Sequence, residues 1–544
     1  MKSNADWPKN LYLISSGNSP SHQKPNLENM GSKAFNLLRM VNIGLPVPPA
    51  LVIGTHYTKS PDDCMLPVFS VGLMALQDAA GLLFGDARKP LIVSVRSGAP
   101  VSMPGMLETL LNIGLCDQTI GGLLRQTGNP RLVWDAYRRL IASYGEVVAG
   151  LPASLFEAEI EHATAGRDER LLDFKDLRDL THQFLSIYKL HAGQAFPQDV
   201  TEQLSGAIRA VFASWQAKKA QEYRKLNQID SAMGTAVTIQ CMVFGNSGGH
   251  SGAGVGFTRN PVTGERQLWV DFLGNAQGED VVSGRRNAHG HQMLAQVAPD
   301  AWRKLEESTQ VLENEFTDMQ DFEFTVQEGL LHMLQTRSGK RTPVARARIA
   351  LDFMDEGLID AATALERTAD LLEEDIGTLK LASKGKKNST VEPLGHAIPA
   401  SSGVVTGEIA LDSQRITERA SAGASVVLVR QDAQTSDIAA LELALGLLTQ
   451  RGARTAHAAV VARQLGKVCL VGCEGLRIDM SARTVQIGKT VLHEGEVITL
   501  DGNDGGIYAG AVASVMVPDK ILLKRLQALR TAQSVGRDHR KKGK

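Results

Sequence analysis

Apolar and polar residues alternate along two neighbouring stretches of this chain, the pattern of strands with one buried face. The stretches are residues 321–326 and 331–337, and the turn between them, 327–330, contains a glycine. Alternation on both sides of a short glycine turn predicts an antiparallel hairpin. Short apolar stretches bounded by turn residues predict further strands at 91–98, 236–244, 423–430, 444–449 and 467–472.

Other regions carry apolar residues at helical spacing. Residues 132–141 do so, and we interpret them as core positions within a mainly helical region from about 120 to 230. Two amphipathic helices are predicted between 344 and 375, and one at 518–529 ahead of a basic tail. The charged stretch 380–387 indicates a flexible linker rather than a nucleic-acid patch.

The length of the chain predicts several domains. A chain of 544 residues is too long for one hydrophobic core and predicts about three or four domains. The changes of pattern divide it into residues 1–340, 341–395, 396–512 and 513–544.

The overall composition narrows the classes of partner. The net charge of −1 provides no basic field, so we expect neither a nucleic-acid nor a membrane partner. The five cysteines form no Cys-x-x-Cys pair, which predicts reduced thiols and a cytoplasmic location. We also expect no signal peptide and no membrane-spanning segment, because no apolar run has the required length.

One histidine, His457, lies where a helix is predicted to begin. Gly452 makes the backbone before this helix more flexible. Thr455 is a residue type that caps helices through its hydroxyl, and Gly466 marks the helix end. Free N–H groups at a helix start favour phosphate, and imidazole is a nucleophile largely neutral near pH 7. The segment therefore fits a phosphorylated histidine stabilised by Arg454, or an ordinary capped helix with a histidine in its first turn.

The predicted hairpin carries charged residues on one face. Asp321 and Glu323 share a face of the first strand, and Gln335 and Arg337 share a face of the second. A turn centred on Gly329 sets Glu323 opposite Gln335 and Asp321 opposite Arg337, unless a bulge shifts the register by one. Such a surface suits Mg²⁺ and phosphate groups, although an exposed hairpin with cross-strand ion pairs has the same spacing.

A glycine-rich stretch follows the strand predicted at 236–244. Residues 245–256 contain six glycines, which let backbone N–H groups approach phosphate oxygens. The stretch is neither a Walker loop nor a dinucleotide fingerprint. Taken alone, it favours a hairpin loop that binds nothing.

Several of these stretches together resemble the pyruvate phosphate dikinase family. Residues 452–463 are similar to the family pattern Gly-Gly-Met-Thr-Ser-His-Ala-Ala-Val-Val-Ala-Arg, and 94–106, 256–261, 275–282 and 319–342 also match. The histidine motif departs from the pattern at Ala453, Arg454 and Ala456. The resemblance covers about residues 25–512, and its motifs agree in order and spacing.

Near the N-terminus, residues 31–37 match the family pattern Gly-Gly-Lys-Gly-x-Asn-Leu, and a helix is predicted to run from here to Gly44. Ser32 and Ala34 replace two glycines, which suggests a stiffer loop. By the resemblance Lys33 is a nucleotide-binding lysine and Arg96 clamps phosphate. A solvated lysine and a salt-bridged arginine at a strand end remain the alternatives.

The resemblance implies an α/β and α+β multidomain chain. It consists of an ATP-grasp nucleotide-binding domain at 1–340 with the helical insertion, a helical linker, and a swivelling β/β/α phosphohistidine domain at 396–512. His457 would carry the phosphate, supported by Arg454 and Thr455. The implied ATP-binding residues are Lys33, Arg96, Gln240, Met242, Glu279, Asp321, Glu323, Gln335 and Arg337. Asp321 and Glu323 would hold Mg²⁺, and the phosphate loop would include Ser251, Gly252 and Gly254.

The family normally continues into a barrel that binds phosphoenolpyruvate and pyruvate, and too few residues follow 512 to form one. We therefore expect a truncated enzyme that binds Mg·ATP and uses ATP and inorganic phosphate to phosphorylate its own His457. The phosphate would pass to an acceptor, with pyruvate on a separate barrel protein as one candidate. The alternative is a non-catalytic ATP-binding regulatory or partner-binding protein.

Overall fold

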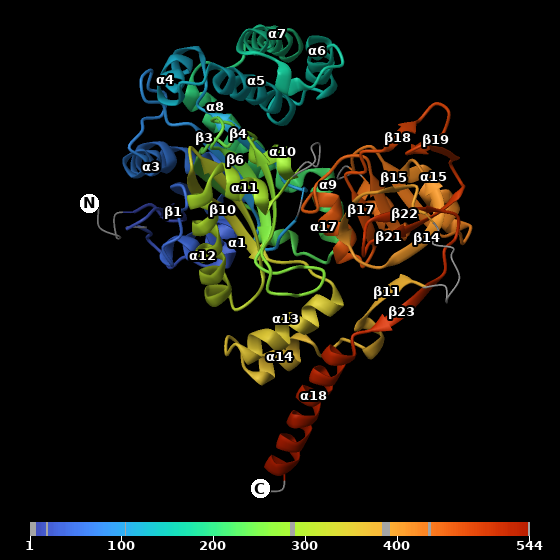
Figure 1. Cartoon of the computed structure of the whole chain (residues 1–544). Helices are drawn as coiled ribbons and strands as arrows, with labels where there is room; N and C mark the ends of the chain where they lie inside the picture. Colours follow the sequence, from blue (N-terminus) through green and yellow to red (C-terminus); the bar gives the residue numbers. More distant parts are fainter. Residues whose placement is uncertain are drawn as a thin grey trace. The chain divides into compact units, whose positions relative to one another are not determined.

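The computed structural model describes residues 7–17, 20–103, 105–282, 289–382, 392–433 and 437–541 (Figure 1). The chain forms two compact units, Met1–Ser251 with Thr325–Thr336, and Gly252–Phe324 with Arg337–Lys544. Sequence reasoning placed residues 1–340 in one domain. In the structure, residues 252–324 group instead with the C-terminal half of the chain.

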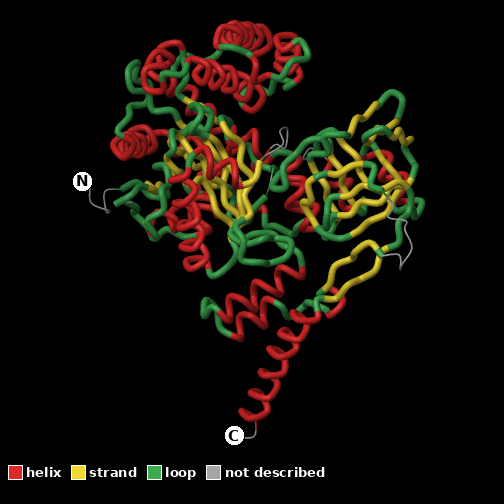
Figure 2. Tube along the Cα trace, in the orientation of Figure 1, coloured by secondary structure: helices red, strands yellow, loops and turns green. Residues whose placement is uncertain are grey.

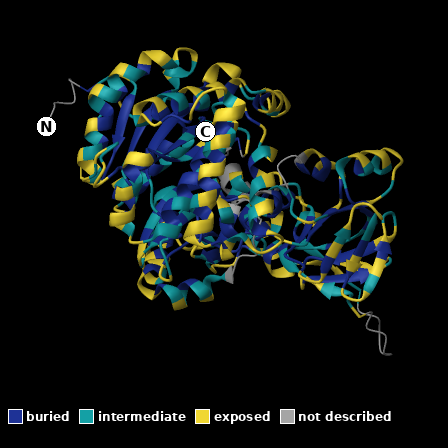
Figure 3. Cartoon of the chain, turned by 90° about the horizontal axis from the view of Figure 1, so that it is seen from above, coloured by how far each residue is buried: buried dark blue, intermediate teal, exposed yellow. Residues whose placement is uncertain are grey.

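The first unit contains a five-stranded antiparallel sheet in the order β1-β2-β5-β3-β4. Its strands are β1 (Leu11–Ile14), β2 (Ala50–Ile53), β3 (Val93–Gly98), β4 (Thr109–Ile113) and β5 (Ala236–Cys241). Most of their residues are buried, as Figure 3 shows in dark blue. The strands predicted at 91–98 and 236–244 are therefore present, and they are direct neighbours.

The helical region predicted at about 120–230 is confirmed, and Figure 2 shows it as helices joined by loops. It contains α4 (Asp117–Thr127), α5 (Pro130–Val147), α6 (Ser154–Thr164), α7 (Phe174–Ala192), α8 (Val200–Ala213) and α9 (Lys218–Leu226). Asn129 caps α5 by accepting a hydrogen bond from the Leu132 amide. The apolar residues of 132–141 are buried in the core, except for the partly buried Trp134, as the spacing predicts.

Helix α1 (Leu27–Asn42) begins four residues before the predicted start at Gly31, and it is kinked at that glycine. Gly31 has φ +73°, and a Cβ there would lie 1.7 Å from the carbonyl oxygen of Gly98. Ser32 donates from both its amide and its hydroxyl to the Ala99 carbonyl, at 3.0 and 2.9 Å. Gly31 and Ser32, which precede Lys33, therefore pack against and hydrogen-bond to the end of β3.

A second five-stranded sheet has the order β10-β9-β6-β7-β8. Its strands are β6 (Gly252–Phe257), β7 (Trp269–Gly274), β8 (His289–Gly290), β9 (Gln320–Gln327) and β10 (Leu330–Ser338), and the helices α10 (Gly278–Val282), α11 (His291–Val297) and α12 (Pro299–Phe316) accompany them. The hairpin predicted at 321–337 is confirmed as β9 and β10. Glu328 and Gly329, both with positive φ, form its turn.

The segment after β10 contains the two predicted helices, α13 (Pro343–Asp355) and α14 (Ala361–Arg367). They share an apolar cluster with α18 (Lys520–Lys541), which starts close to the predicted position but extends well past 529. Residues 380–381, predicted as linker, belong instead to β11 (Gly377–Leu381), which pairs with β23 (Ser514–Pro518). The remainder of that predicted linker, from 383 on, lies outside the described residues.

The rest of the second unit is a β/β/α arrangement. Its eight-stranded sheet has the order β12-β22-β21-β14-β15-β16-β17-β13, and β14 to β17 are parallel. One apolar cluster joins this sheet to the small sheet β18-β19-β20, and another joins it to helices α15, α16 and α17. The predicted strands at 423–430, 444–449 and 467–472 are confirmed as β15, β16 and β17.

The bounds of these elements are β12 (Gly395–His396), β13 (Ile398–Ser401), β14 (Val404–Ala410), α15 (Ser413–Ser421), β15 (Val426–Arg430), α16 (Ile438–Leu443), β16 (Gly446–Thr449), α17 (His457–Gln464), β17 (Val468–Val471), β18 (Leu476–Asp479), β19 (Thr484–Ile487), β20 (Thr490–His493), β21 (Val497–Asp501) and β22 (Gly506–Ala509). Helix α17 connects the parallel strands β16 and β17. Its first residue therefore follows the carboxyl end of a buried strand, where parallel sheets commonly place ligand-binding residues.

Candidate nucleotide and phosphohistidine site

Arg96 is the centre of a polar cluster in the first unit. Its Nη1 donates to the Leu334 carbonyl at 3.2 Å and to Gln240 Oε1 at 3.4 Å, and its Nη2 donates to Gln335 Oε1 at 3.2 Å. The structure thus brings together three predicted ATP-binding residues from β3, β5 and β10. These three acceptor oxygens are uncharged, and a guanidinium suits phosphate because it donates several charge-assisted hydrogen bonds.

Lys33 packs beside the end of β3, the strand of Arg96, and Met242 follows Gln240 in the chain. Gly98, two residues beyond Arg96 on β3, is so near α1 that a Cβ on it would lie 3.6 Å from the Cβ of Lys33. Met242 follows Gln240 by two residues, and its amide donates to the Ile92 carbonyl at 2.9 Å. Both side chains are partly buried.

Sequence reasoning missed Thr238. This residue lies directly opposite Arg96 in the β3–β5 register and two residues before Gln240, so all three side chains share one face of the sheet. Thr238 is 2% exposed, and within the described part of the chain its hydroxyl has no hydrogen-bond partner. The two-residue spacing from Gln240 was the available signal.

The second unit holds the predicted carboxylate–arginine pair. Arg337 Nε donates to Asp321 Oδ2 at 2.8 Å, so the predicted juxtaposition of these two residues is confirmed. Gln335, expected opposite Glu323, accepts a hydrogen bond from Arg96. Asp321 is only 2% exposed, which excludes the alternative of an exposed surface pair.

The charges at this pair perturb each other. Burial raises the pKa of Asp321, Arg337 opposes that rise, and the negative charge of Glu323 adds to it. Burial lowers the pKa of Arg337, but the Asp321 and Glu323 carboxylates outweigh burial and raise it. Two carboxylates that repel each other at a buried position form an environment that a cation would stabilise.

These carboxylates suit Mg²⁺ as a partial ligand set. In the described ranges no group of three or more His, Cys, Asp or Glu residues is arranged to hold a metal by itself. Mg²⁺ commonly binds through one or two carboxylates and completes its coordination with water and substrate phosphates. Asp321 and Glu323 fit that role.

Gly252 and Gly254, expected within a loop, lie in the buried strand β6. A Cβ on Gly252 would lie 2.1 Å from the Phe272 ring, and one on Gly254 would lie 2.3 Å from the Phe324 ring. These glycines are required for aromatic packing across the sheet. The possibility of a hairpin loop is wrong, since β5 and β6 belong to different sheets.

The loop itself is shorter than predicted and ends at Ser251. The Ser251 hydroxyl accepts from the Glu328 amide at 2.9 Å, and the His250 carbonyl accepts from the Gly329 amide at 2.9 Å. The loop is thereby attached to the turn of the β9–β10 hairpin. Glu279, the remaining nucleotide-site candidate, is exposed on the short helix α10.

His457 is the first residue of α17, as predicted, and the helix ends just before Gly466, which has positive φ. The side chain of His457 lies outside the described part of the structure. The expectation that the Thr455 hydroxyl caps the helix is wrong. Ala456 is the N-cap residue, and among described residues the buried Thr455 hydroxyl has no partner.

Arg454, expected to support a phosphate, makes a different contact in the structure. Its Nε and Nη2 donate to Asp271 Oδ1 at 3.0 and 2.9 Å, and the Thr455 amide donates to Asp271 Oδ2 at 3.0 Å. A carboxylate therefore occupies the anion-binding position just before α17. Sequence reasoning missed Asp271, which no local pattern distinguished.

Comparison with known proteins agrees with these features. Residues 74–297 match the model of the pyruvate phosphate dikinase AMP/ATP-binding domain, and residues 423–505 match that of the mobile domain of phosphoenolpyruvate-utilising enzymes. The chain belongs to the pyruvate phosphate dikinase family. The second match contains α17 and the first contains Arg96 and Gln240, whereas Lys33 and the hairpin 321–337 lie outside both matches.

Two of the curated relatives that the chain matches are plant pyruvate, phosphate dikinases. The chain is 39% identical over 512 residues to pyruvate, phosphate dikinase 1, chloroplastic, of Zea mays, which covers 92% of this chain and 54% of the relative. It is 41% identical over 491 residues to the chloroplastic enzyme of Flaveria trinervia, covering 88% of this chain and 51% of that protein. The chain thus spans about half the length of the relatives it matches.

Two further observations concern the cysteine thiols and the possibility of a membrane-spanning helix. All five cysteines are free and buried, and burial raises the pKa of Cys64, Cys241 and Cys469 to about 12. No helix within the described ranges is long and apolar enough to cross a membrane.

Proposed function

We propose that this chain is a phosphotransferase that binds Mg·ATP and phosphorylates its own His457. The principal support for this proposal comes from two contacts of strand β10. Gln335 on this strand contacts Arg96, and Arg337 on the same strand contacts Asp321. Lys33, Gln240, Met242 and Glu279 are the further nucleotide-binding candidates. Family membership and the match to an ATP-binding domain support the same assignment.

In the proposed half-reaction, ATP, inorganic phosphate and His457 give AMP, pyrophosphate and phosphohistidine. An imidazole nitrogen forms a bond to the β-phosphorus while the bond from that phosphorus to the oxygen of AMP breaks. The γ-phosphoryl group leaves the β-phosphate and forms a new P–O–P bond with inorganic phosphate, which gives pyrophosphate, and the imidazole N–H proton is released. Arg96 and Arg337 neutralise charge on the phosphates and orient them, which is the main requirement of phosphoryl transfer. Mg²⁺ held by Asp321 and Glu323 would supply charge neutralisation between the phosphates.

Labelling tests the proposal directly. The purified chain is incubated with ATP labelled at the β-phosphate, Mg²⁺ and inorganic phosphate, and acid-labile label on the protein is measured. We expect label on the wild type and on His493→Ala, whose histidine is exposed on β20, but none on His457→Ala. An unlabelled wild type would overturn the half-reaction and favour the non-catalytic, regulatory or partner-binding alternative.

The second half of the proposed reaction passes the phosphate from His457 to an acceptor. We propose pyruvate bound to a separate phosphoenolpyruvate/pyruvate-binding barrel protein as that acceptor. Isolated phosphorylated chain is mixed with labelled pyruvate and a candidate barrel protein, and labelled phosphoenolpyruvate is measured. We also propose a cytoplasmic location, supported by the five free thiols, which suit a reducing compartment.

A further inference from the structure

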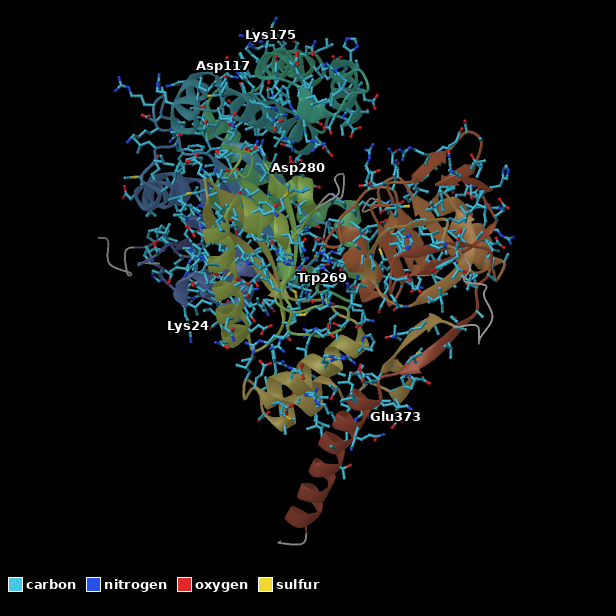
Figure 4. The ribbon with its side chains drawn as sticks, viewed as in Figure 1. Lys24, Asp117, Lys175, Trp269, Asp280 and Glu373 are labelled. Carbon is cyan, nitrogen blue, oxygen red and sulfur yellow. The ribbon has the colours of Figure 1, made fainter. Side chains whose placement is uncertain are left out.

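Side chains of strands β6 and β7 contact residues 454–463, which we call the histidine segment. Phe257 lies directly opposite Trp269 in the antiparallel register, so the two side chains share a face of the sheet. Asp271 is two residues beyond Trp269 on β7 and therefore lies on the same face. We call Phe257, Trp269 and Asp271 the docking face; Trp269 is labelled in Figure 4.

Two arginines of the histidine segment stack on the aromatic residues of the docking face. The guanidinium carbon of Arg454 lies 4.3 Å from the Trp269 ring centre, and that of Arg463 lies 5.3 Å from the Phe257 ring centre. Arg463 Nη2 also donates to the Arg454 carbonyl at 3.0 Å. Val460 of α17 joins the apolar cluster around Phe257. The segment is thus held by stacking, hydrogen bonding and apolar packing.

Asp271 supplies the charged part of this contact. The carboxylate side chain is 3% exposed and accepts from Arg454 and from the Thr455 amide. A buried carboxylate requires compensation, and here both compensating donors come from the three residues that precede His457. Such a pair adds little net stability, but it favours the single arrangement in which all its partners are satisfied.

The negative charge of Asp321, the proposed metal-binding carboxylate, also acts on Arg463 of this segment. Burial lowers the pKa of Arg463 to about 10, and the negative charges of Asp321 and Asp271 both oppose that shift. Asp321 lies on β9, the neighbour of β6 in the sheet. Helix α17 therefore docks on the sheet that carries the Asp321–Arg337 pair.

We propose that Asp271 and Arg454 are positioning residues that hold the start of α17, and with it His457, in the pose for receiving phosphate. This inference rests on the proposed function. It depends on a departure from the family pattern, in which methionine occupies the position of Arg454. In this chain an ion pair with Asp271 takes the place of an uncharged side chain and fixes the approach of the segment to the sheet.

The test compares Asp271→Asn, Arg454→Met and the double variant with wild type. Arg451→Met is the matched control, because Arg451 is an exposed arginine three residues from Arg454. Hydrogen exchange of the amides of residues 454–461 reports docking without any reaction. The labelling assay reports the rate of His457 phosphorylation and the KM for ATP.

We expect faster exchange across 454–461 in each single variant and a labelling rate lowered about tenfold or more, because small misplacements of a reacting group are costly. The KM for ATP stays unchanged, since Arg96, Gln335 and Asp321 are untouched. The double variant resembles the single ones, because both substitutions break the same contact. Arg451→Met behaves as wild type.

Wild-type exchange and wild-type labelling rates in Arg454→Met would overturn the inference, as would fully additive effects in the double variant. Should Asp271→Asn fail to fold, Arg454→Met still decides, since that side chain is 24% exposed. An unlabelled wild type defeats the proposed function. The exchange comparison would then still show whether the ion pair docks α17.

Discussion

Arg337 and Asp321 lie on adjacent strands of the β9–β10 hairpin, with Arg337 Nε 2.8 Å from Asp321 Oδ2. The carboxylate is almost fully buried, whereas the arginine side chain is 28% exposed. The pair therefore holds a buried negative charge beside a positive charge that solvent and ligands can reach. This arrangement suits a site in which a cation and a phosphate bind together.

Asp321→Asn should abolish the proposed magnesium-dependent chemistry with little loss of fold. The amide keeps the size of the side chain but removes the anionic ligand, so we expect His457 labelling to fall about a hundredfold or more. Glu306→Gln, at an exposed position of α12 in the same unit, is the control and should label normally. Normal labelling of Asp321→Asn would remove this residue from the proposed site.

Gly254→Ala should destabilise the protein. The new Cβ would lie 2.3 Å from the Phe324 ring and 2.9 Å from the Asp271 carbonyl oxygen, so the strand or the ring must move. We expect this movement to lower the free energy of unfolding by about 1–3 kcal/mol. Gly249→Ala lies in the preceding exposed loop with nothing within 4 Å of the added Cβ and should change stability by less than about 0.5 kcal/mol. Urea denaturation measures both. Equal effects would contradict the packing role of Gly254.

Glu313→Gln should be more damaging than removal of a surface carboxylate. Arg259 is fully buried and bonds both Glu313 and Glu356, so Glu313→Gln removes one charged partner and leaves the guanidinium paired with Glu356, at a cost of about 1.5–3 kcal/mol. Glu307→Gln breaks an exposed pair with Lys304 and should cost less than about 1 kcal/mol. Chemical denaturation gives the comparison, and a small effect of Glu313→Gln would show that Glu356 alone suffices.

His332 should make stability depend on pH. Burial lowers its pKa below the ordinary value of 6.5, so between the two values the unfolded chain binds more protons than the folded one. The free energy of unfolding therefore rises with pH through that interval and falls as the pH drops from about 7 to about 5. In His332→Gln this part of the dependence should disappear, as measured by thermal unfolding at both pH values.

His191→Gln serves as the control for that measurement, because His191 is exposed at the end of α7. Its pH dependence should follow that of wild type. If His332→Gln also follows wild type, then other groups cause the loss of stability at low pH.

The sequence by itself determined most of the local structure. Alternation at 321–326 and 331–337 predicted β9 and β10, and it placed Asp321 beside Arg337 correctly. The glycine at 466 and the small residues before it likewise located α17. These successes have one cause: strand and helix periods, turns and helix ends are set by neighbours a few residues apart.

The tertiary structure alone decided which distant residues meet. Gly252 and Gly254 have the composition of a phosphate loop, and only the packing of Phe272 and Phe324 shows why they are glycines. β23 exists because it pairs with β11, a segment more than 130 residues earlier in the chain.

Arg454 illustrates the same limit at the site. The sequence predicted correctly that an anion suits the start of α17, but the anion in the structure is Asp271, 183 residues away. Local patterns record the backbone geometry that each residue favours. The partner of a buried charge depends on how whole sheets and helices pack, and no short window of sequence contains that information.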